Sequence, residues 1–298
     1  RYMKQDKNCE LLVHYPTVQA VEDEKIRELL EDFFVTTSSM REQKAFLDAN
    51  FEKISRCNLP DCSELKPLFY RKNVVIVGAG SSVNGELDSL KKYRDNIMVF
   101  ATGHITSTLL QEGIVPDALI ITDQQSHMYQ QVEGLDTKNI PLILLSTASA
   151  SVIDYYEGSV YIAYQKGYDN AEEKAEQMGV MTFETEGSVT TTALDIALQF
   201  QAESLIFVGV DLAYTSGASH AESVGRTITD TENLKKVTSC SGGEVYTSKN
   251  LDIYRKWIER RIRNVKDTVI YNTRNGARIE GAEWKNWEEI NNEILNIR

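Results

Sequence analysis

The sequence is poor in cysteine, proline and basic residues, and each shortage excludes a class of protein. Four cysteines in 298 residues are too few for a disulfide framework, and Cys57 and Cys62 have no second His or Cys pair at zinc spacing, which leaves structural zinc a minor alternative. Five prolines and a hydrophobic content of 42% are typical of a globular chain rather than a disordered one. Lys and Arg number 32 against 44 Asp and Glu, and the resulting charge of −12 argues against a nucleic-acid-binding protein.

Long apolar runs are also missing. Stretches such as 140–145 and 205–208 are far shorter than the roughly 20 residues that a membrane-spanning helix needs. We therefore expect no transmembrane segment and a cytoplasmic location. The chain begins at Arg1 rather than Met, which suggests that it is part of a longer polypeptide.

The hydrophobic pattern changes near residue 70. Before it, apolar residues recur at helical spacing over 21–34 and again from Ser39 to Ile54, which predicts two helices and no strand. We expect residues 1–70 to form a helical flank. Residues 71–298 are expected to form the main domain, with a C-terminal helical extension from about residue 249.

Short β-branched runs alternate with amphipathic segments from Asn73 onwards. Because these runs are continuously apolar, we expect them to be buried on both faces, as in a parallel sheet covered by helices. The predicted fold class is α/β, with a doubly wound, mostly parallel, Rossmann-like sheet. The predicted strands are 74–77, 97–101, 118–122, 142–146, 160–163, 205–209 and 269–271, and the predicted helices are 85–93, 149–156, 170–178, 189–200, 249–264 and a stretch from Trp284.

A glycine-rich turn, Gly78-Ala79-Gly80-Ser81-Ser82, follows the first predicted strand. Ligands of doubly wound folds bind at the carboxyl ends of the strands, and glycines let a ligand approach backbone N–H groups. A dinucleotide fingerprint fails here because Val83 replaces its third glycine and the second strand ends on Thr102-Gly103 without a carboxylate. A P-loop fails because Glu86 follows Gly85 where Lys is needed. A tight turn without a ligand remains the alternative.

A second helix start carries hydroxyl groups. Ser188 follows Gly187 as a natural N-cap, and three threonines from Thr190 fill the first turn of the predicted helix. Capping alone accounts for Ser188, whereas consecutive threonines are poor helix formers and suit a phosphate or a carboxylate. Asp123 and Asp211 each follow a predicted strand, so either one binds a ligand or caps a turn.

His220 is the best candidate for chemistry among the four histidines. It lies in a loop of small residues soon after Asp211, and imidazole can accept a proton from a hydroxyl nucleophile near neutral pH. His104, which follows the second strand, is the second choice.

The order of several motifs resembles that of one known family. They are Gly78–Val83, Gly113–Asp117, Thr122–Asp123, Gly187–Val189, Gly209–Tyr214, Ser219–Ala221 and, at Asn272–Gly281, a closing Gly-Ala-x-Ile-x-Gly pattern. The chain resembles the motility accessory factors, which are bacterial flagellin glycosyltransferase-like proteins. These share an MptE-like domain (domain of unknown function 115) with archaeal 6-hydroxymethylpterin diphosphokinases. The resemblance covers roughly residues 70–285.

The resemblance implies a nucleotide-sugar-binding domain over residues 71–298, related to bacterial sialyltransferases. The implied donor is a CMP-activated nonulosonic acid, and the implied acceptor is a Ser or Thr hydroxyl of flagellin or another protein. Neither a cofactor nor a nucleic acid is expected. In this interpretation Asp211 would fix the donor or orient the base, and His220 would deprotonate the acceptor. The donor-binding candidates are Gly78, Gly80, Ser81, Ser82, Thr102, Gly103, Asp123, Gly187, Ser188 and Thr190.

Two other functions compete with this interpretation. A 6-hydroxymethylpterin diphosphokinase would move pyrophosphate from ATP and require Mg²⁺, with Asp123 and Asp211 as its ligands. A non-catalytic nucleotide-binding protein would keep the fold and lack the chemistry.

Overall fold

The computed structural model describes residues 13–215 and 234–295. The chain divides into two compact units, residues 1–45 and 46–298. The first unit contains α1 (Tyr15–Gln19) and most of α2 (Glu24–Ser55), with the rings of Tyr15 and Phe34 in contact at 4.9 Å. The prediction of two separate helices was wrong, because the segment between them holds no glycine or proline that would interrupt a helix.

The second unit is built on one large parallel sheet. Nine strands of the described residues form it, in the order β11-β10-β7-β1-β2-β3-β4-β5-β6. Every neighbouring pair is parallel. The bounds are β1 (Asn73–Val77), β2 (Met98–Thr102), β3 (Ala118–Ile121), β4 (Leu142–Leu145), β5 (Val160–Gln165), β6 (Thr182–Phe183), β7 (Ser204–Val208), β10 (Val269–Asn272) and β11 (Glu283–Trp284).

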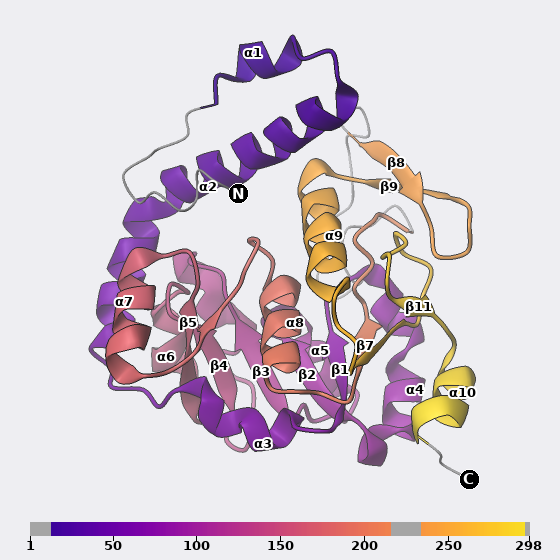
Figure 1. The fold of residues 1–298 in the computed structure, drawn as a ribbon. Helices are drawn as coiled ribbons and strands as arrows, with labels where there is room; N and C mark the ends of the chain where they lie inside the picture. Colours follow the sequence, from indigo (N-terminus) through magenta and orange to yellow (C-terminus); the bar gives the residue numbers. More distant parts are fainter. Residues whose placement is uncertain (1–12, 216–233, 296–298) are drawn as a thin grey trace. The chain divides into compact units, whose positions relative to one another are not determined.

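The strand order confirms the predicted doubly wound fold. From β1 the chain builds outwards to β6, then crosses back to place β7, β10 and β11 on the other side of β1 (Figure 1). The winding therefore reverses between β1 and β7. This topological switch point is where two neighbouring connections leave the sheet in opposite directions and open a crevice at its carboxyl edge.

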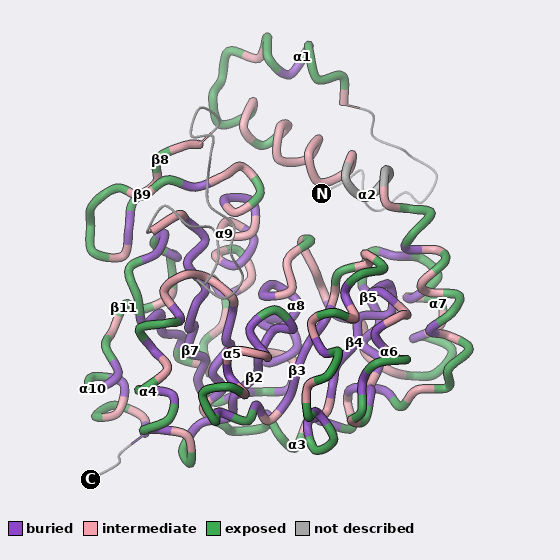
Figure 2. The backbone as a smooth tube through the Cα atoms, turned by 180° about the vertical axis from the view of Figure 1, so that it is seen from behind, coloured by how far each residue is buried: buried purple, intermediate pink, exposed green. Residues whose placement is uncertain are grey.

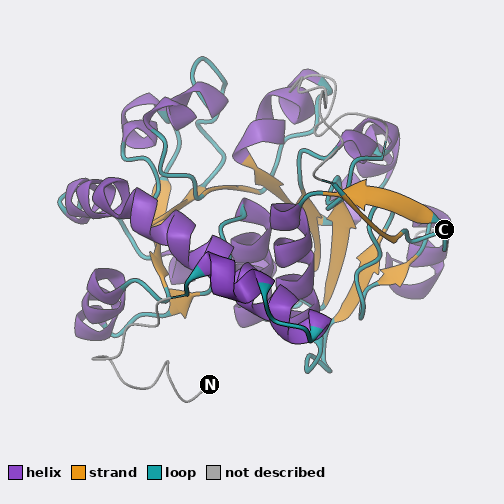
Figure 3. Ribbon diagram, turned by 90° about the horizontal axis from the view of Figure 1, so that it is seen from above, coloured by secondary structure: helices purple, strands orange, loops and turns teal. Residues whose placement is uncertain are grey.

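Burial of both sheet faces explains why the strands are continuously apolar. All five residues of β2 and of β7 are buried, and Figure 2 shows the central strands in purple. Helices lie on both sides of the row of strands (Figure 3). Those of the second unit are α3 (Lys66–Phe69), α4 (Leu87–Lys92), α5 (Thr106–Gln111), α6 (Ser151–Tyr155), α7 (Asp169–Met178), α8 (Val189–Gln199), α9 (Lys249–Ile262) and α10 (Trp287–Ile290).

Helix α8 is the most deeply buried of these helices. All residues from Thr190 to Ala197 are buried, and the helix contacts β1, β2 and β3. Because it connects two parallel strands, β6 and β7, it runs back along the sheet, and its first turn lies at the carboxyl edge. The predicted helix 189–200 is thereby confirmed and placed at the edge where ligands bind.

Three short pairings escaped the sequence prediction. An antiparallel hairpin of β8 (Lys235–Thr238) and β9 (Glu244–Thr247) stands beside α9 in Figure 1. The two-residue strand β6 extends one edge of the large sheet, and β11 extends the other. The prediction of a helix from Trp284 was wrong in its start, because Trp284 lies in β11 and α10 begins at Trp287.

None of the helices in the described ranges combines the length and apolar character needed to cross a membrane.

Candidate functional site

The glycine turn after β1 packs directly on the turn after β7, at the switch point of the sheet. The Gly80 N–H donates to the carbonyl oxygen of Gly209 at 2.8 Å. A Cβ atom on Gly80 would lie 2.6 Å from that oxygen and 2.8 Å from the carboxylate of Asp211. Glycine is therefore required at position 80 because the two turns approach so closely.

Asp211 joins the two turns through its side chain. Its carboxylate accepts hydrogen bonds from the Ser82 N–H at 3.0 Å, from the Ser82 hydroxyl and from the Ser81 hydroxyl at 3.4 Å. We call Gly80, Ser81, Ser82, Gly209 and Asp211 the Asp211 clasp. Burial raises the pKa of Asp211, and the hydrogen bonds from Ser82 and Ser81 oppose that rise.

Within the Asp211 clasp, backbone N–H groups of the glycine turn are not available to a ligand. The N–H groups of Gly80 and Ser82, which the sequence suggested for a phosphate, are already bound to Gly209 and Asp211. The Asp211 carboxylate thus occupies the anion position at the start of the 3₁₀ helix Ser81–Gly85. The hydroxyl of Ser81, which donates to Asp211, also lies 3.1 Å from the hydroxyl of Thr215.

Two residues of the closing Gly-Ala-x-Ile-x-Gly pattern contact the backbone of Asp211. The Ala277 N–H donates to the carbonyl oxygen of Asp211 at 2.8 Å. A Cβ on Gly276 would lie 2.4 Å from the same oxygen, so only glycine fits there. The hairpin adds a bond from Thr247 to the carbonyl oxygen of Leu212 at 2.7 Å. The pattern at 276–281, with no role assigned from the sequence, therefore holds the clasp in place.

The start of α8 forms a second polar group at the carboxyl edge. Ser188 caps the helix by accepting the Thr190 N–H at 3.4 Å, and the Thr191 hydroxyl bonds the Ser188 carbonyl at 2.6 Å. The Glu186 N–H donates in turn to the Thr191 hydroxyl at 3.2 Å. Local capping thus accounts for Thr191 as well as Ser188. Among the described residues, the hydroxyls of Thr190 and Thr192 have no capping role, and that of Thr192 is buried without a hydrogen-bond partner.

Tyr254 of α9 reaches this second group and was missed by the sequence prediction. A Cβ on Gly187 would lie 3.7 Å from its hydroxyl oxygen. Burial raises the pKa of Tyr254, and the charges of Glu186 and Asp123 raise it further. Gly187 and Tyr254 therefore lie together at one part of the edge.

The remaining candidates make local structural contacts. The Asp123 carboxylate accepts the Gln125 N–H at 2.9 Å, which is a turn-capping bond. Thr102 is buried, and its carbonyl oxygen accepts the Thr106 hydroxyl at 3.3 Å. Gly103 lies where a Cβ would come within 2.9 Å of the Ile121 side chain. Gly78 packs on Gly209 in the same way as Gly80.

His220 lies in 216–233, outside the described residues.

The two aspartates that a magnesium site would use already make hydrogen bonds within the protein. Both oxygens of Asp211 accept bonds from Ser82, and one oxygen of Asp123 accepts the Gln125 N–H. Over residues 13–215 and 234–295, no group of three or more His, Cys, Asp or Glu side chains could hold a metal ion.

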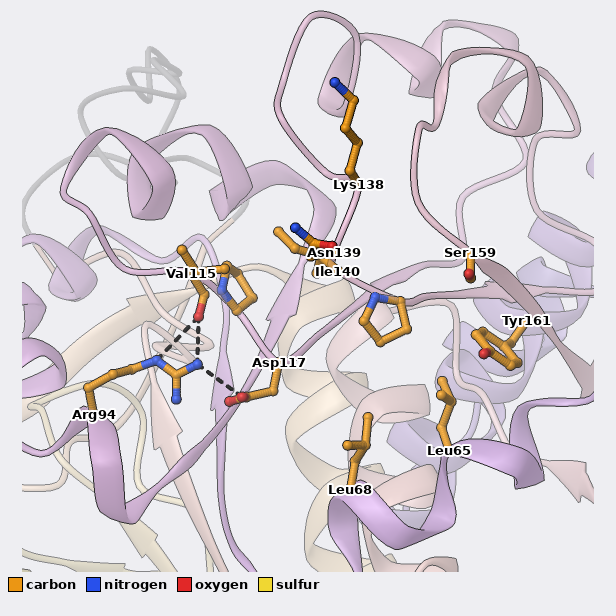
Figure 4. A pocket seen from close by; sticks show the side chains of 12 residues that line it. Leu65, Leu68, Arg94, Val115, Asp117, Lys138, Asn139, Ile140, Ser159 and Tyr161 are labelled. Carbon is orange, nitrogen blue, oxygen red and sulfur yellow. Dashed lines mark hydrogen bonds and ion pairs between the residues drawn. The ribbon is translucent and has the colours of Figure 1, made fainter.

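Two cavities lie away from the clasp. One of about 520 Å³ is drawn in Figure 4, and its Asp117, Pro141 and Ser159 directly precede β3, β4 and β5, so it lies at the amino edge of the sheet. Its Arg94 is bound to Asp117 at 3.0 Å and to the Val115 carbonyl oxygen. The other, of about 460 Å³, lies between the hairpin, α9 and residues 278–280. Because ligands of this fold class bind at the carboxyl edge, we assign the candidate site to the clasp.

The fold and the switch-point turns define a Rossmann-like α/β protein, and comparison with known proteins places it in a family. A model of the family described as 6-hydroxymethylpterin diphosphokinase MptE-like matches residues 47–217, and the chain belongs to this family. No curated protein matches the chain.

A solved structure shares the fold. The MAf glycosyltransferase of Magnetospirillum magneticum AMB-1 superposes with a TM-score of 0.62 at 21% sequence identity. The match covers 74% of this chain and 34% of that one, so the chain spans about a third of that protein. The family match confirms the predicted MptE-like domain, and the second comparison shows that the fold is shared with a MAf glycosyltransferase.

Proposed function

We propose that the protein is a glycosyltransferase that binds a nucleotide-activated sugar at the carboxyl ends of β1 and β7. The observation that carries this proposal is the Asp211 clasp at the topological switch point, where doubly wound folds bind their ligands. The fold shared with the MAf glycosyltransferase supports the same function. The cavity at the opposite edge would require a binding mode foreign to this fold class.

The proposed donor is a CMP-activated nonulosonic acid, and the proposed acceptor is a Ser or Thr hydroxyl of flagellin or a similar protein. His220 accepts the proton of the acceptor hydroxyl, and the acceptor oxygen attacks the anomeric carbon. The bond from that carbon to the phosphate oxygen breaks, and CMP leaves with the electron pair. Asp211 is buried and already hydrogen-bonded, so we assign it a positioning role in holding the turn that faces the donor.

The description of the matching family favours a second function, a diphosphokinase that uses ATP. Calorimetric titration with CMP, and with ATP in the presence and absence of Mg²⁺, separates the two. CMP binding without metal is the result we expect. ATP binding that depends on Mg²⁺ would instead support the diphosphokinase, and binding of neither would favour a protein that lacks both activities.

Replacing His220 by alanine tests the proposed mechanism. We expect release of CMP from CMP-pseudaminic acid, in the presence of flagellin, to fall by about 10²–10⁴-fold, because proton transfer is lost. Binding of CMP itself should not change. His127→Ala, an exposed histidine in the 3₁₀ helix Ser126–Gln131, is the matched control. Turnover that survives in His220→Ala would show that another group accepts the proton.

A further inference from the structure

Arg274 is held rigidly beside the glycine turn, although about half of its side chain is exposed. It follows β10 at the carboxyl edge, and its Nε donates to the carboxylate of Glu86. One terminal nitrogen, Nη2, donates to the carbonyl oxygen of Gly85. Its side chain is 49% exposed, whereas that of Glu86 is only 2% exposed. The guanidinium plane is therefore fixed at the surface by two independent contacts.

Arg274 packs on chain segments that also form the candidate site. A Cβ on Gly85 would come within 2.9 Å of Nη2, so the absence of a side chain there lets the guanidinium lie flat. Gly85 ends the 3₁₀ helix that begins at Ser81, and Gly276 packs on Asp211 two residues after Arg274. Arg274 thus joins the end of this 3₁₀ helix to the segment that packs on Asp211.

Charge neutralisation of Glu86 does not account for this geometry. The second oxygen of Glu86 accepts the indole N–H of Trp287, whose ring stacks on Tyr93 at 5.4 Å. The ion pair with Glu86 uses only the Nε of Arg274, whereas a separate hydrogen bond from Nη2 binds the carbonyl oxygen of Gly85. Within the described residues, the other terminal nitrogen, Nη1, makes no hydrogen bond, and a guanidinium with a free edge is suited to bind a phosphate oxygen.

We propose that Arg274 binds a phosphate group of the ligand that occupies the carboxyl edge at the clasp. This inference rests on the proposed function for the identity of the nucleotide, but the phosphate chemistry holds for any phosphorylated ligand. Arg274 supplies the positive charge that the glycine turn does not, because the N–H groups of Gly80 and Ser82 are already bound within the protein.

The test compares CMP with cytidine, which lacks the phosphate, by calorimetric titration of the whole protein. We expect the wild type to prefer CMP, and Arg274→Gln to lose about 10- to 100-fold in affinity for CMP with cytidine unchanged, as for the loss of a charge-assisted hydrogen bond. Trp287→Phe is the matched control, because it removes the other bond to Glu86 and leaves Arg274 in place. It should lower the melting temperature without changing the preference for CMP.

Titration with pyrophosphate separates this inference from the proposed function. If the wild type binds pyrophosphate through Arg274 but does not prefer CMP to cytidine, the CMP donor is wrong and the phosphate site stands. If Arg274→Gln keeps the wild-type preference for CMP and only lowers the melting temperature, as Trp287→Phe should, Arg274 is merely a partner of Glu86 and the inference fails. If the wild type binds neither CMP nor pyrophosphate, both proposals are overturned.

Discussion

Replacing Gly80 by alanine is expected to lower the free energy of unfolding by about 3 kcal/mol, the upper end of the usual cost of overpacking. The new methyl group would lie 2.6 Å from a backbone oxygen of Gly209 and 2.8 Å from the Asp211 carboxylate, and the backbone oxygen cannot rotate away. The φ angle of Gly80 is −62°, which alanine adopts freely, so the effect is purely steric. Urea unfolding measures it.

Gly243→Ala is the matched control for this prediction. Gly243 also lacks a left-handed φ, but a Cβ there would meet only the Ser239 hydroxyl, at an ordinary contact distance of 3.6 Å. We expect its stability to stay within about 0.5 kcal/mol of the wild type. If Gly80→Ala is as stable as Gly243→Ala, the two turns do not pack as described. CMP affinity should fall with Gly80→Ala and not with the control.

Replacing Asp252 by alanine is also expected to lower the free energy of unfolding substantially. Asp252 of α9 is fully buried and forms ion pairs with Lys235 of the hairpin and with Arg255 and Lys256 of its own helix. Loss of the carboxylate takes one buried partner from each of these three cations, which costs about 3 kcal/mol, the lower end for a broken buried pair. The lower end applies because Lys235 and Lys256 are partly exposed and can be hydrated.

Ionisation of Asp252 is expected to make the stability of the protein depend on pH. Burial alone would raise the pKa of Asp252, but contacts with Lys235 and Arg255 and the charge of Lys256 outweigh it and lower the pKa to about 2. A folded-state pKa below the ordinary value of 3.8 means that the carboxylate stabilises the protein above about pH 4. This contribution is lost as the pH falls from about 4 to 2.

Asp252→Asn should therefore flatten the pH dependence of stability between pH 4 and 2, followed by the urea midpoint. Glu52→Ala is the control, because the pair of Glu52 with Arg56 is two-thirds or more exposed and should contribute less than about 1 kcal/mol. A wild-type profile in Asp252→Asn would show that the three cations do not depend on this carboxylate.

The sequence predicts the strands of the sheet well because their signal is local. Runs such as Val74–Val77 and Leu205–Val208 are apolar without interruption, and each became a strand buried on both faces. The glycine turn and Asp211 could likewise be placed at strand ends. Their contact could not be predicted, because 129 residues separate Ser82 from Asp211, and their meeting depends on the insertion of β7 beside β1.

The elements that escaped prediction are those whose stability comes from distant contacts. The hairpin strand Lys235–Thr238 alternates half-buried and exposed residues over only four positions, and it is anchored by Lys235 on Asp252. Arg274 looks like an ordinary polar loop residue until β10 brings it against Gly85 and Glu86. A single sequence carries no local signal for either contact.

A crystal structure of the protein soaked with CMP locates the proposed donor site. We expect the nucleotide at the carboxyl ends of β1 and β7, in contact with the Ser81 hydroxyl. Its phosphate should lie within hydrogen-bond distance of Arg274. Nucleotide density in the cavity at the amino edge, beside Arg94 and Asp117, would contradict this expectation.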